Sequence, residues 1–83
     1  MGYDLELSQN AKRDLDSLEK TTVIRILKKL REIIIDPYRY VKRLTGSELF
    51  SLRIGDYRVL MILNKEKIFV VKIGHRRDVY TDS

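Results

Sequence analysis

The spacing of the apolar residues changes near the middle of the chain, and this change constrains the fold more than any other feature of the sequence. In the first half, apolar residues recur every three or four positions, first across residues 11–18 and then across residues 23–34, as in amphipathic helices. From Leu49 onward they alternate with polar residues or run continuously, as in strands. The chain therefore combines a helical part with a sheet-forming part.

Capping and turn residues mark where these elements begin and end. Alternation over residues 3–7 predicts a first strand, and Ser8 can cap a helix because its hydroxyl can accept a backbone N–H of the first turn. Residues 20–22, Lys-Thr-Thr, interrupt the helical pattern and are predicted to cap a second helix. That helix is predicted to end at Asp36, because Pro37 disfavours helical geometry in the residue before it. The two helices form an α-helical hairpin.

The second half predicts three consecutive strands. Residues 50–54 alternate, Gly55-Asp56 offers a tight turn, and residues 57–63 are apolar on both faces, as in a central strand. Residues 64–67 form a second polar turn, and residues 68–73 form the last strand. The predicted fold class is α+β: an N-terminal strand, an α-helical hairpin and a three-strand antiparallel meander. The helices are expected on one face of a small, mainly antiparallel sheet.

Length and composition limit the kinds of function that the chain can have. Eighty-three residues allow one domain, residues 1–83, with little room for a buried cavity. The absence of cysteine excludes disulfides, cysteine-ligated zinc and a thiolate nucleophile. No apolar run approaches the ~20 residues that cross a bilayer, and the N-terminus has no signal pattern. We therefore expect a cytoplasmic protein with no membrane partner that acts on something larger than itself.

The excess of basic residues lies entirely in the second half. The net charge is +5. Up to Pro37 the chain has seven basic and seven acidic residues, and beyond Pro37 it has ten basic and five acidic ones. This one-sided excess favours a polyanion or an acidic protein as partner, because attraction speeds the encounter and phosphate contacts release counterions. A basic surface that serves only solubility is the alternative.

Several side chains of this second half could carry chemistry. Arg53 alternates with apolar strand neighbours, so it is predicted to face away from the helices if those neighbours face them. Arg58 follows the hairpin turn, where its side chain can reach solvent. The other candidates are basic or aromatic residues of a loop and of the C-terminal segment: Lys42, Arg43, His75, Arg76, Arg77 and Tyr80. Each of them could instead be an ordinary solvated or packing residue.

The reactions open to these residues are few. The acidic residues have no paired spacing and there is a single histidine, so no metal site is predicted. Glycine-rich phosphate loops and dinucleotide fingerprints are absent, so no cofactor is predicted. Cleavage of RNA through its own 2′-hydroxyl needs neither, because it requires only a base, an acid and cations around the phosphorane-like transition state. Arginine suits the role of the cation, because the N–H groups of its planar guanidinium match the spacing of phosphate oxygens.

Four segments together resemble the RelE/ParE superfamily of toxins, and more closely its RelE branch. They are Tyr3-Asp4-Leu5 with Ala11 and Leu15, then Leu44-Thr45-Gly46, then residues 52–59, and finally residues 73–80. The similarity covers nearly the whole chain, and the order Gly74-His75-Arg76 followed by Val79-Tyr80 indicates the branch. The resemblance implies a single RelE-like toxin domain of a RelBE-type toxin–antitoxin system. Such a toxin is a ribosome-dependent, metal-independent endoribonuclease, an mRNA interferase that cuts mRNA in the ribosomal A site and inhibits translation.

The resemblance also implies roles for individual residues. Arg58 matches the arginine proposed to stabilise the transition state. Arg76 matches a C-terminal arginine implicated in protonation of the leaving group or in charge stabilisation, and Tyr80 matches a tyrosine that stacks on or orients a base.

One departure from the family concerns the general base. Some members have two lysines on the strand before the first hairpin, where this chain has Leu49 and Ser51. Glu48, His75 and Tyr80 are the remaining candidates for the base. Arg53, Arg77, Lys42 and Arg43 are expected to bind RNA.

The resemblance implies two partners and leaves two other functions open. The partners are a small RelB-like antitoxin, in an assembly up to a heterotetramer, and the ribosome with bound mRNA. The alternatives are a ParE-like inhibitor of DNA gyrase, which performs no chemistry of its own, and a plain RNA-binding domain.

Overall fold

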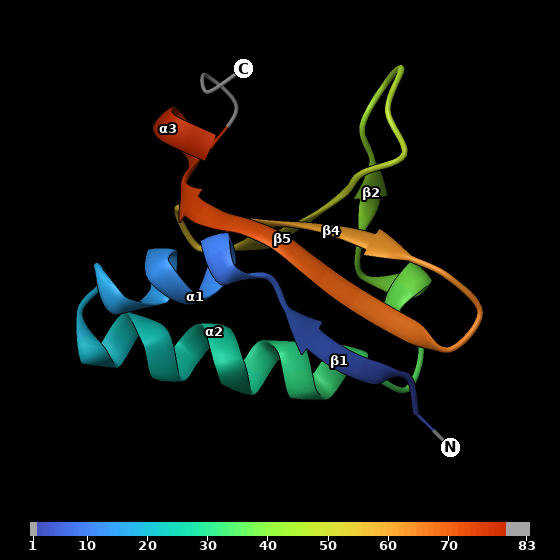
Figure 1. Ribbon diagram of the computed structural model, residues 1–83, viewed down its shortest axis with the longest axis horizontal. Helices are drawn as coiled ribbons and strands as arrows, with labels where there is room; N and C mark the ends of the chain where they lie inside the picture. Colours follow the sequence, from blue (N-terminus) through green and yellow to red (C-terminus); the bar gives the residue numbers. More distant parts are fainter. Residues whose placement is uncertain (1, 80–83) are drawn as a thin grey trace.

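The computed structural model describes residues 2–79, and its elements follow the predicted order (Figure 1). They are β1 (Asp4–Leu7), α1 (Gln9–Asp16), α2 (Lys20–Ile33), the 3₁₀ helix η1 (Pro37–Arg39), β2 (Lys42–Arg43), β3 (Phe50–Ile54), β4 (Tyr57–Leu63), β5 (Lys67–His75) and α3 (Arg76–Val79). No helix within residues 2–79 is long and apolar enough to cross a lipid bilayer.

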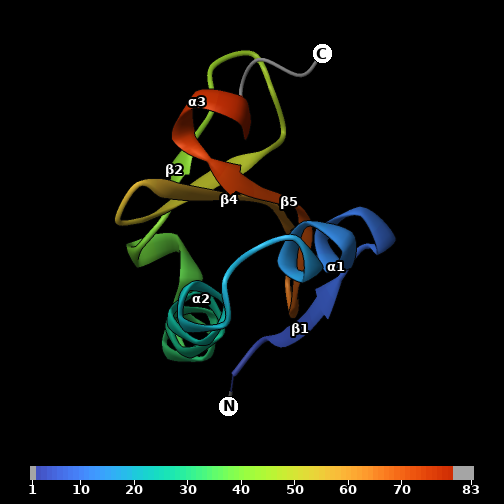
Figure 2. The ribbon, with the colours of Figure 1, turned by 90° about the vertical axis from the view of Figure 1, so that its left-hand side faces the viewer.

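The strands form one sheet in the order β1-β5-β4-β3-β2. β1 pairs with β5 in parallel, and all other neighbours are antiparallel. The hairpin of α1 and α2 lies on one face of the sheet, whereas α3 and the loop between β2 and β3 project from the other face (Figures 1 and 2). The α+β prediction is confirmed, including the helical hairpin on one face of a mainly antiparallel sheet.

β2 is an addition to the predicted meander. Residues 42 and 43 are predicted as loop, but Lys42 pairs with Ser51 and Arg43 with Phe50 along the outer edge of β3. A strand of two residues shows no alternation in the sequence. It forms because the edge of β3 offers backbone groups that need partners.

The caps of α1 and α2 differ. Ser8 caps α1 as predicted, since its Oγ lies 3.0 Å from the Ala11 nitrogen that donates to it. The predicted cap of α2 at residues 20–22 is wrong: the N-cap is Glu19, without a side-chain hydrogen bond. Val23 N donates to the carbonyl of Glu19, so the helix begins at Lys20 and both threonines lie inside it.

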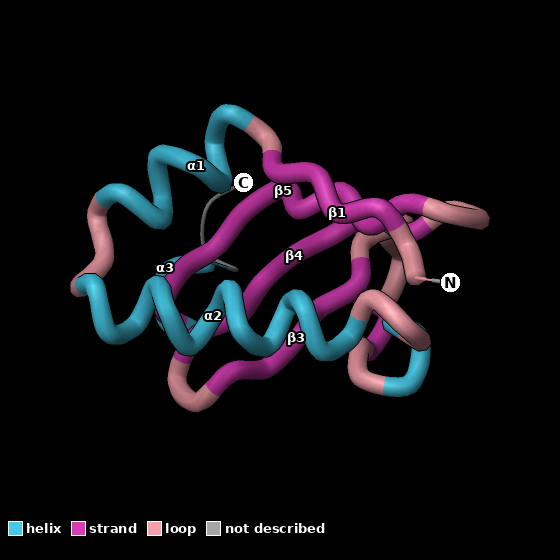
Figure 3. Tube along the Cα trace, turned by 90° about the horizontal axis from the view of Figure 1, so that it is seen from below, coloured by secondary structure: helices cyan, strands magenta, loops and turns pink. Residues whose placement is uncertain are grey.

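The core lies between the helices and the sheet. Seen from the helix side, α2 runs across β3 and β4 while α1 lies beside β5 (Figure 3). The largest buried side chains of this interface are Ile26, Leu30 and Ile33 of α2 and Leu52, Val59, Met61, Ile68 and Val70 of the sheet. Burial of these apolar surfaces is the main stabilising contribution to such a domain.

Two polar contacts join the N-terminal elements to β5. Asp14 Oδ2 of α1 accepts a hydrogen bond from Ile73 N at 2.9 Å, beyond the end of β1, and so covers part of the open edge of β5. Lys67 Nζ donates to Glu6 Oε1 at 2.9 Å, and this hydrogen bond raises the pKa of Lys67. α1 and α2 cover one face of the sheet, and the opposite face carries charged side chains, Arg53 and Arg58, beside apolar ones, Leu60, Ile62 and Phe69.

Candidate nucleic-acid interface

The sheet face opposite α1 and α2 carries two arginines side by side. Arg53 of β3 pairs directly with Arg58 of β4, and Arg58 pairs in turn with Gly74 of β5. Leu52 and Ile54, the neighbours of Arg53 along β3, are buried under the helices. Because alternate residues of a strand face opposite sides, Arg53 points away from the helices, as predicted, and Arg58 shares its face.

A second row of paired residues crosses the same strands, two positions along each strand from Arg53 and Arg58. Lys42 pairs with Ser51, Ser51 with Leu60, and Leu60 with Lys72. Ser51 shares the face of Arg53, so Lys42 and Lys72 do too. We call the four side chains Lys42, Arg53, Arg58 and Lys72 the cationic face.

The pairing of Arg53 with Arg58 is electrostatically unfavourable. Like charges directly opposite one another on neighbouring strands destabilise a sheet. Arg58 turns its Nη1 toward the carbonyls of Gly55 and Tyr57, at 3.3 and 3.1 Å, while Arg53 is exposed. Lys29 pairs with Glu32 and Lys67 pairs with Glu6, and neither of these ion pairs involves Arg53 or Arg58. An anion bound at this face would relieve the repulsion.

The turn between β3 and β4 also holds α3. Arg76 N donates to the carbonyl of Asp56 at 2.8 Å, which places the start of α3 beside the turn that precedes Arg58. Val79 is 2% exposed and lies over Gly74, on the face that Arg58 occupies. Arg76 and Arg77 are exposed. The structure therefore brings Arg76 to the same turn as Arg58 from a distant part of the sequence.

His75 lies on the other side of β5. It pairs with Tyr57, which packs against the core, and the two rings meet edge to face with centroids 5.7 Å apart. The backbone N–H of Arg77 donates to His75 Nδ1 at 3.2 Å, so this nitrogen acts as an acceptor. The ring lines a hollow of about 500 Å³ together with Asp14, Tyr57 and Asp78, among others. The register of β4 and β5 thus places His75 on the sheet face opposite Arg58.

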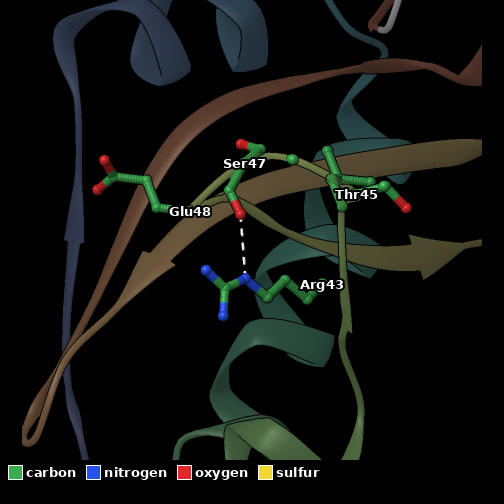
Figure 4. Close-up of a pocket in the computed structure, with 6 residues that line it drawn as sticks. Arg43, Thr45, Ser47 and Glu48 are labelled. Atoms are coloured by element: carbon green, nitrogen blue, oxygen red, sulfur yellow. Dashed lines mark hydrogen bonds between the residues drawn. The ribbon is translucent and has the colours of Figure 1, made fainter.

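Arg43, at the end of β2, and Glu48, in the loop between β2 and β3, are two further candidates from the sequence. Arg43 pairs with Phe50, not with Ser51, so the register gives it the face opposite to Lys42. Its Nε donates to the Ser47 carbonyl at 3.0 Å, and Glu48 and Thr45 point to opposite sides of the loop (Figure 4). Arg43 is therefore engaged with its own loop.

Tyr80 lies outside residues 2–79, which the structure describes. Within that range, no three histidine or acidic side chains are grouped in a way that could hold a metal ion.

Sequence reasoning missed a second group of cations beside Arg53. Arg25, Lys28, Lys29 and Glu32 of α2 line a hollow of about 380 Å³ together with Arg53, Ile54 and Gly55. These α2 residues lie in the half of the chain whose charges balance, so the count of charges by halves conceals them. The spacing of Arg25, Lys28 and Lys29 on one helix face was the signal that could have found them.

The fold and its arginine-bearing face define a class of protein: a small toxin of the RelE/ParE superfamily. The chain belongs to the family described as the ParE toxin of the type II toxin–antitoxin system parDE, whose model matches residues 5–80. No curated protein matches the chain in sequence.

Solved structures of toxin–antitoxin complexes share the fold. The RelBE2 complex of Mycobacterium tuberculosis is 23% identical, with a TM-score of 0.83 over 92% of this chain and 100% of that chain. The archaeal RelE–RelB complex of Pyrococcus horikoshii is 26% identical, with a TM-score of 0.78 over 95% and 100%. The chromosomal ParDE system of P. aeruginosa is 12% identical, with a TM-score of 0.74 over 88% and 95%. Both branches of the superfamily are therefore among the similar structures.

Proposed function

We propose that this toxin is a ribosome-dependent endoribonuclease that cleaves mRNA in the A site and so inhibits translation. The observation that carries the proposal is the direct pairing of Arg53 with Arg58, next to a turn to which Arg76 is also tied. A pair of guanidiniums on neighbouring strands, with the backbone of Arg76 held at the adjoining turn, suits a phosphate that gains negative charge during a reaction. The likeness to the RelE–RelB complex of P. horikoshii supports the same branch.

In the proposed reaction the ribose 2′-oxygen attacks the neighbouring phosphorus, and the bond from phosphorus to the 5′-oxygen breaks. The proton of the 2′-hydroxyl passes to a base and another proton reaches the 5′-oxygen, which yields a 2′,3′-cyclic phosphate and a 5′-hydroxyl. Arg58 and Arg76 stabilise the charge on the phosphorane-like transition state. Tyr80 stacks on or orients a base of the message. Glu48 and Tyr80 remain the candidates for proton transfer, whereas His75 is disfavoured because the register places it on the face opposite Arg58.

The proposed partners are the ribosome with its message and a small antitoxin. Similar structures are complexes of RelE with RelB, which supports a RelB-like antitoxin for this chain. An antitoxin that covers the cationic face or displaces α3 would remove the arginines from reach of RNA and would make the toxin too bulky for the A site.

The test is the chemistry of the product ends. Purified toxin is incubated with ribosomes that carry a defined message, and the fragments are analysed for their termini. We expect a 2′,3′-cyclic or 3′-phosphate, and we expect no cleavage of a message with 2′-deoxyribose at the scissile nucleotide. A 3′-hydroxyl product, or cleavage of the deoxy message, would exclude this mechanism because both require an external nucleophile.

A second function is favoured by the family match itself, which is to the ParE toxin. A ParE-like inhibitor of DNA gyrase would bind its target without cleaving RNA. Induction of such a toxin in cells would cause DNA breaks and leave messages intact, whereas the ribonuclease would truncate messages at A-site positions and leave DNA whole. A plain RNA-binding domain would differ from both by binding free RNA without ribosomes.

A further inference from the structure

The hollow between α2 and the edge of β3 continues the cationic face around the β3–β4 turn. Arg53 belongs to both, since it pairs with Arg58 on the sheet and lines the hollow with Arg25 and Lys28. Arg25 and Arg58 also meet at one residue, Gly55. Arg25 Nη2 lies 2.9 Å from where a Cβ of Gly55 would stand, and Arg58 Nη1 donates to the Gly55 carbonyl.

The cationic side chains that line the hollow differ in their contacts. Lys29 forms an ion pair with Glu32 at 3.5 Å, and its Nζ lies 5.3 Å from the centre of the Tyr40 ring. Arg25 and Lys28 are exposed on the same helix. With Arg53, they give three positive charges that the single carboxylate of the hollow, already paired with Lys29, does not neutralise.

We propose that Arg25 and Lys28 bind phosphates of an RNA backbone, so that the track of RNA contacts runs from Arg58 through Arg53 and over the β3–β4 turn onto α2. This inference rests on the proposed function, because it assumes that RNA occupies the cationic face. The ligand is a phosphodiester chain, and either the message or ribosomal RNA could supply it.

The chemistry of the hollow favours RNA over an acidic peptide. Peptide and protein partners are anchored mainly by apolar or aromatic side chains that enter a pocket. The apolar side chain of this hollow is Ile54, which is 8% exposed and belongs to the core. Phosphate contacts need no apolar anchor, because the energy comes from charge and from the release of counterions. The fork of Arg25 can hold two oxygens of one phosphate.

The test compares Arg25→Gln with Arg31→Gln. Both variants remove one exposed guanidinium from α2, but Arg31 does not line the hollow. Binding to ribosomes is measured across a series of salt concentrations, with a message that carries 2′-deoxyribose at the scissile nucleotide so that it stays whole. We expect Arg25→Gln to reduce the slope of log affinity against log salt by about 1 and Arg31→Gln to leave it unchanged.

Two further arms identify the source of the phosphate. If Arg25→Gln reduces the slope equally with and without a message in the A site, ribosomal RNA supplies the phosphate. If Arg25→Gln reduces the slope only when the message is present, the message supplies the phosphate. Thermal unfolding of each variant checks that the fold is kept, and Arg25→Lys, which retains the charge, should restore most of the slope.

Equal slopes for Arg25→Gln and wild type would overturn the inference, as would a loss confined to the association of the variant with an acidic antitoxin. Cleavage of an unmodified message is assayed in parallel and reports on the proposed function separately. If the toxin cleaves the message but the salt slopes of Arg25→Gln and wild type are equal, only the proposed RNA track is refuted. If the slope of Arg25→Gln changes but the wild-type toxin does not cleave the message, the proposed reaction is refuted and the RNA track is supported.

Discussion

Gly55 is the residue at which the cationic side chains of the two halves meet. Its φ of 58° lies in the left-handed region that side chains with a Cβ rarely adopt. The residue closes the turn before Arg58, its carbonyl accepts from that arginine, and Arg25 lies against its open side. A glycine here therefore shapes the turn and also leaves room for a guanidinium.

Gly46 provides a matched control for Gly55, because its φ of 72° is similar but nothing lies within 4 Å of an added Cβ. Replacement of either glycine by alanine should lower the free energy of unfolding by about 1–2 kcal/mol, the cost of left-handed geometry. Only Gly55→Ala should also displace Arg25, whose Nη2 would stand 2.9 Å from the new methyl group. Urea unfolding measures the first effect, and the salt dependence of RNA binding measures the second. An unchanged stability of both variants would contradict the assigned strain.

Arg58 is expected to act on rate more than on affinity. If it stabilises the transition state, Arg58→Ala should raise the barrier to cleavage by about 2–4 kcal/mol, with a much smaller effect on ribosome binding. Single-turnover cleavage and equilibrium binding measure the two quantities. Because Arg58 also donates to the carbonyls of the β3–β4 turn, Arg58→Lys and thermal unfolding serve as checks on the fold. Equal losses in rate and in affinity would assign Arg58 a binding role instead.

At the scale of elements, Ser8 joins α1 to β5. Its Oγ accepts from Ala11 N at 3.0 Å and donates to the Val71 carbonyl at 2.8 Å. Ser8→Ala removes both contacts and should lower the free energy of unfolding by about 0.5–2 kcal/mol, as for other N-cap serines. Ser17→Ala is the control on the same helix, since its exposed Oγ only donates to the Asp14 carbonyl; it should change stability by less than about 0.5 kcal/mol. A Ser17 effect as large as the Ser8 effect would contradict this assignment.

The elements that could be predicted are those long enough to show a period. α1, β3 and β4 have a cap, an alternation or a turn that belongs to the local sequence. β2 and α3 have two and four residues, which is too short to show a period, and they are held by contacts with β3 and with β4 and β5. The start of α2 was predicted late because threonines often cap helices, yet here Glu19 takes that position without a side-chain bond.

The candidate site likewise contains some residues that the sequence of one strand can place and others that only contacts between elements can place. Alternation along β3 was enough to place Arg53, since that argument needs one strand only. The position of His75 depends on the register between β4 and β5, which shifts between Leu60 and Met61. Arg25 reaches Gly55 only because α2 packs beside the edge of β3. Neither relation leaves a pattern within a single stretch of sequence.

Across the whole molecule, four cationic side chains share one sheet face, where they surround the buried Leu60. The helices and the sheet share one core, while Lys42, Arg53, Arg58 and Lys72 lie on the face that this core leaves open. The α2 cations extend this positive surface around the edge of β3. A small domain with its positive charge concentrated in this way attracts an acidic partner from a distance.

The association of the proposed antitoxin should therefore slow as salt is added. Between about 0.05 and 0.5 M salt, the distance over which charges are screened falls from more than about 10 Å to a few Å. Long-range attraction then disappears, whereas the contacts within the complex are little affected. Stopped-flow association rates across this range should fall steeply for the wild type and less steeply for Arg53→Gln, which removes a charge from the cationic face. Lys65→Gln, in the exposed turn between β4 and β5, should keep the wild-type dependence because it lies outside that face. A rate that is independent of salt would mean that charge does not steer the antitoxin, and the arginines would then have to be explained by RNA alone.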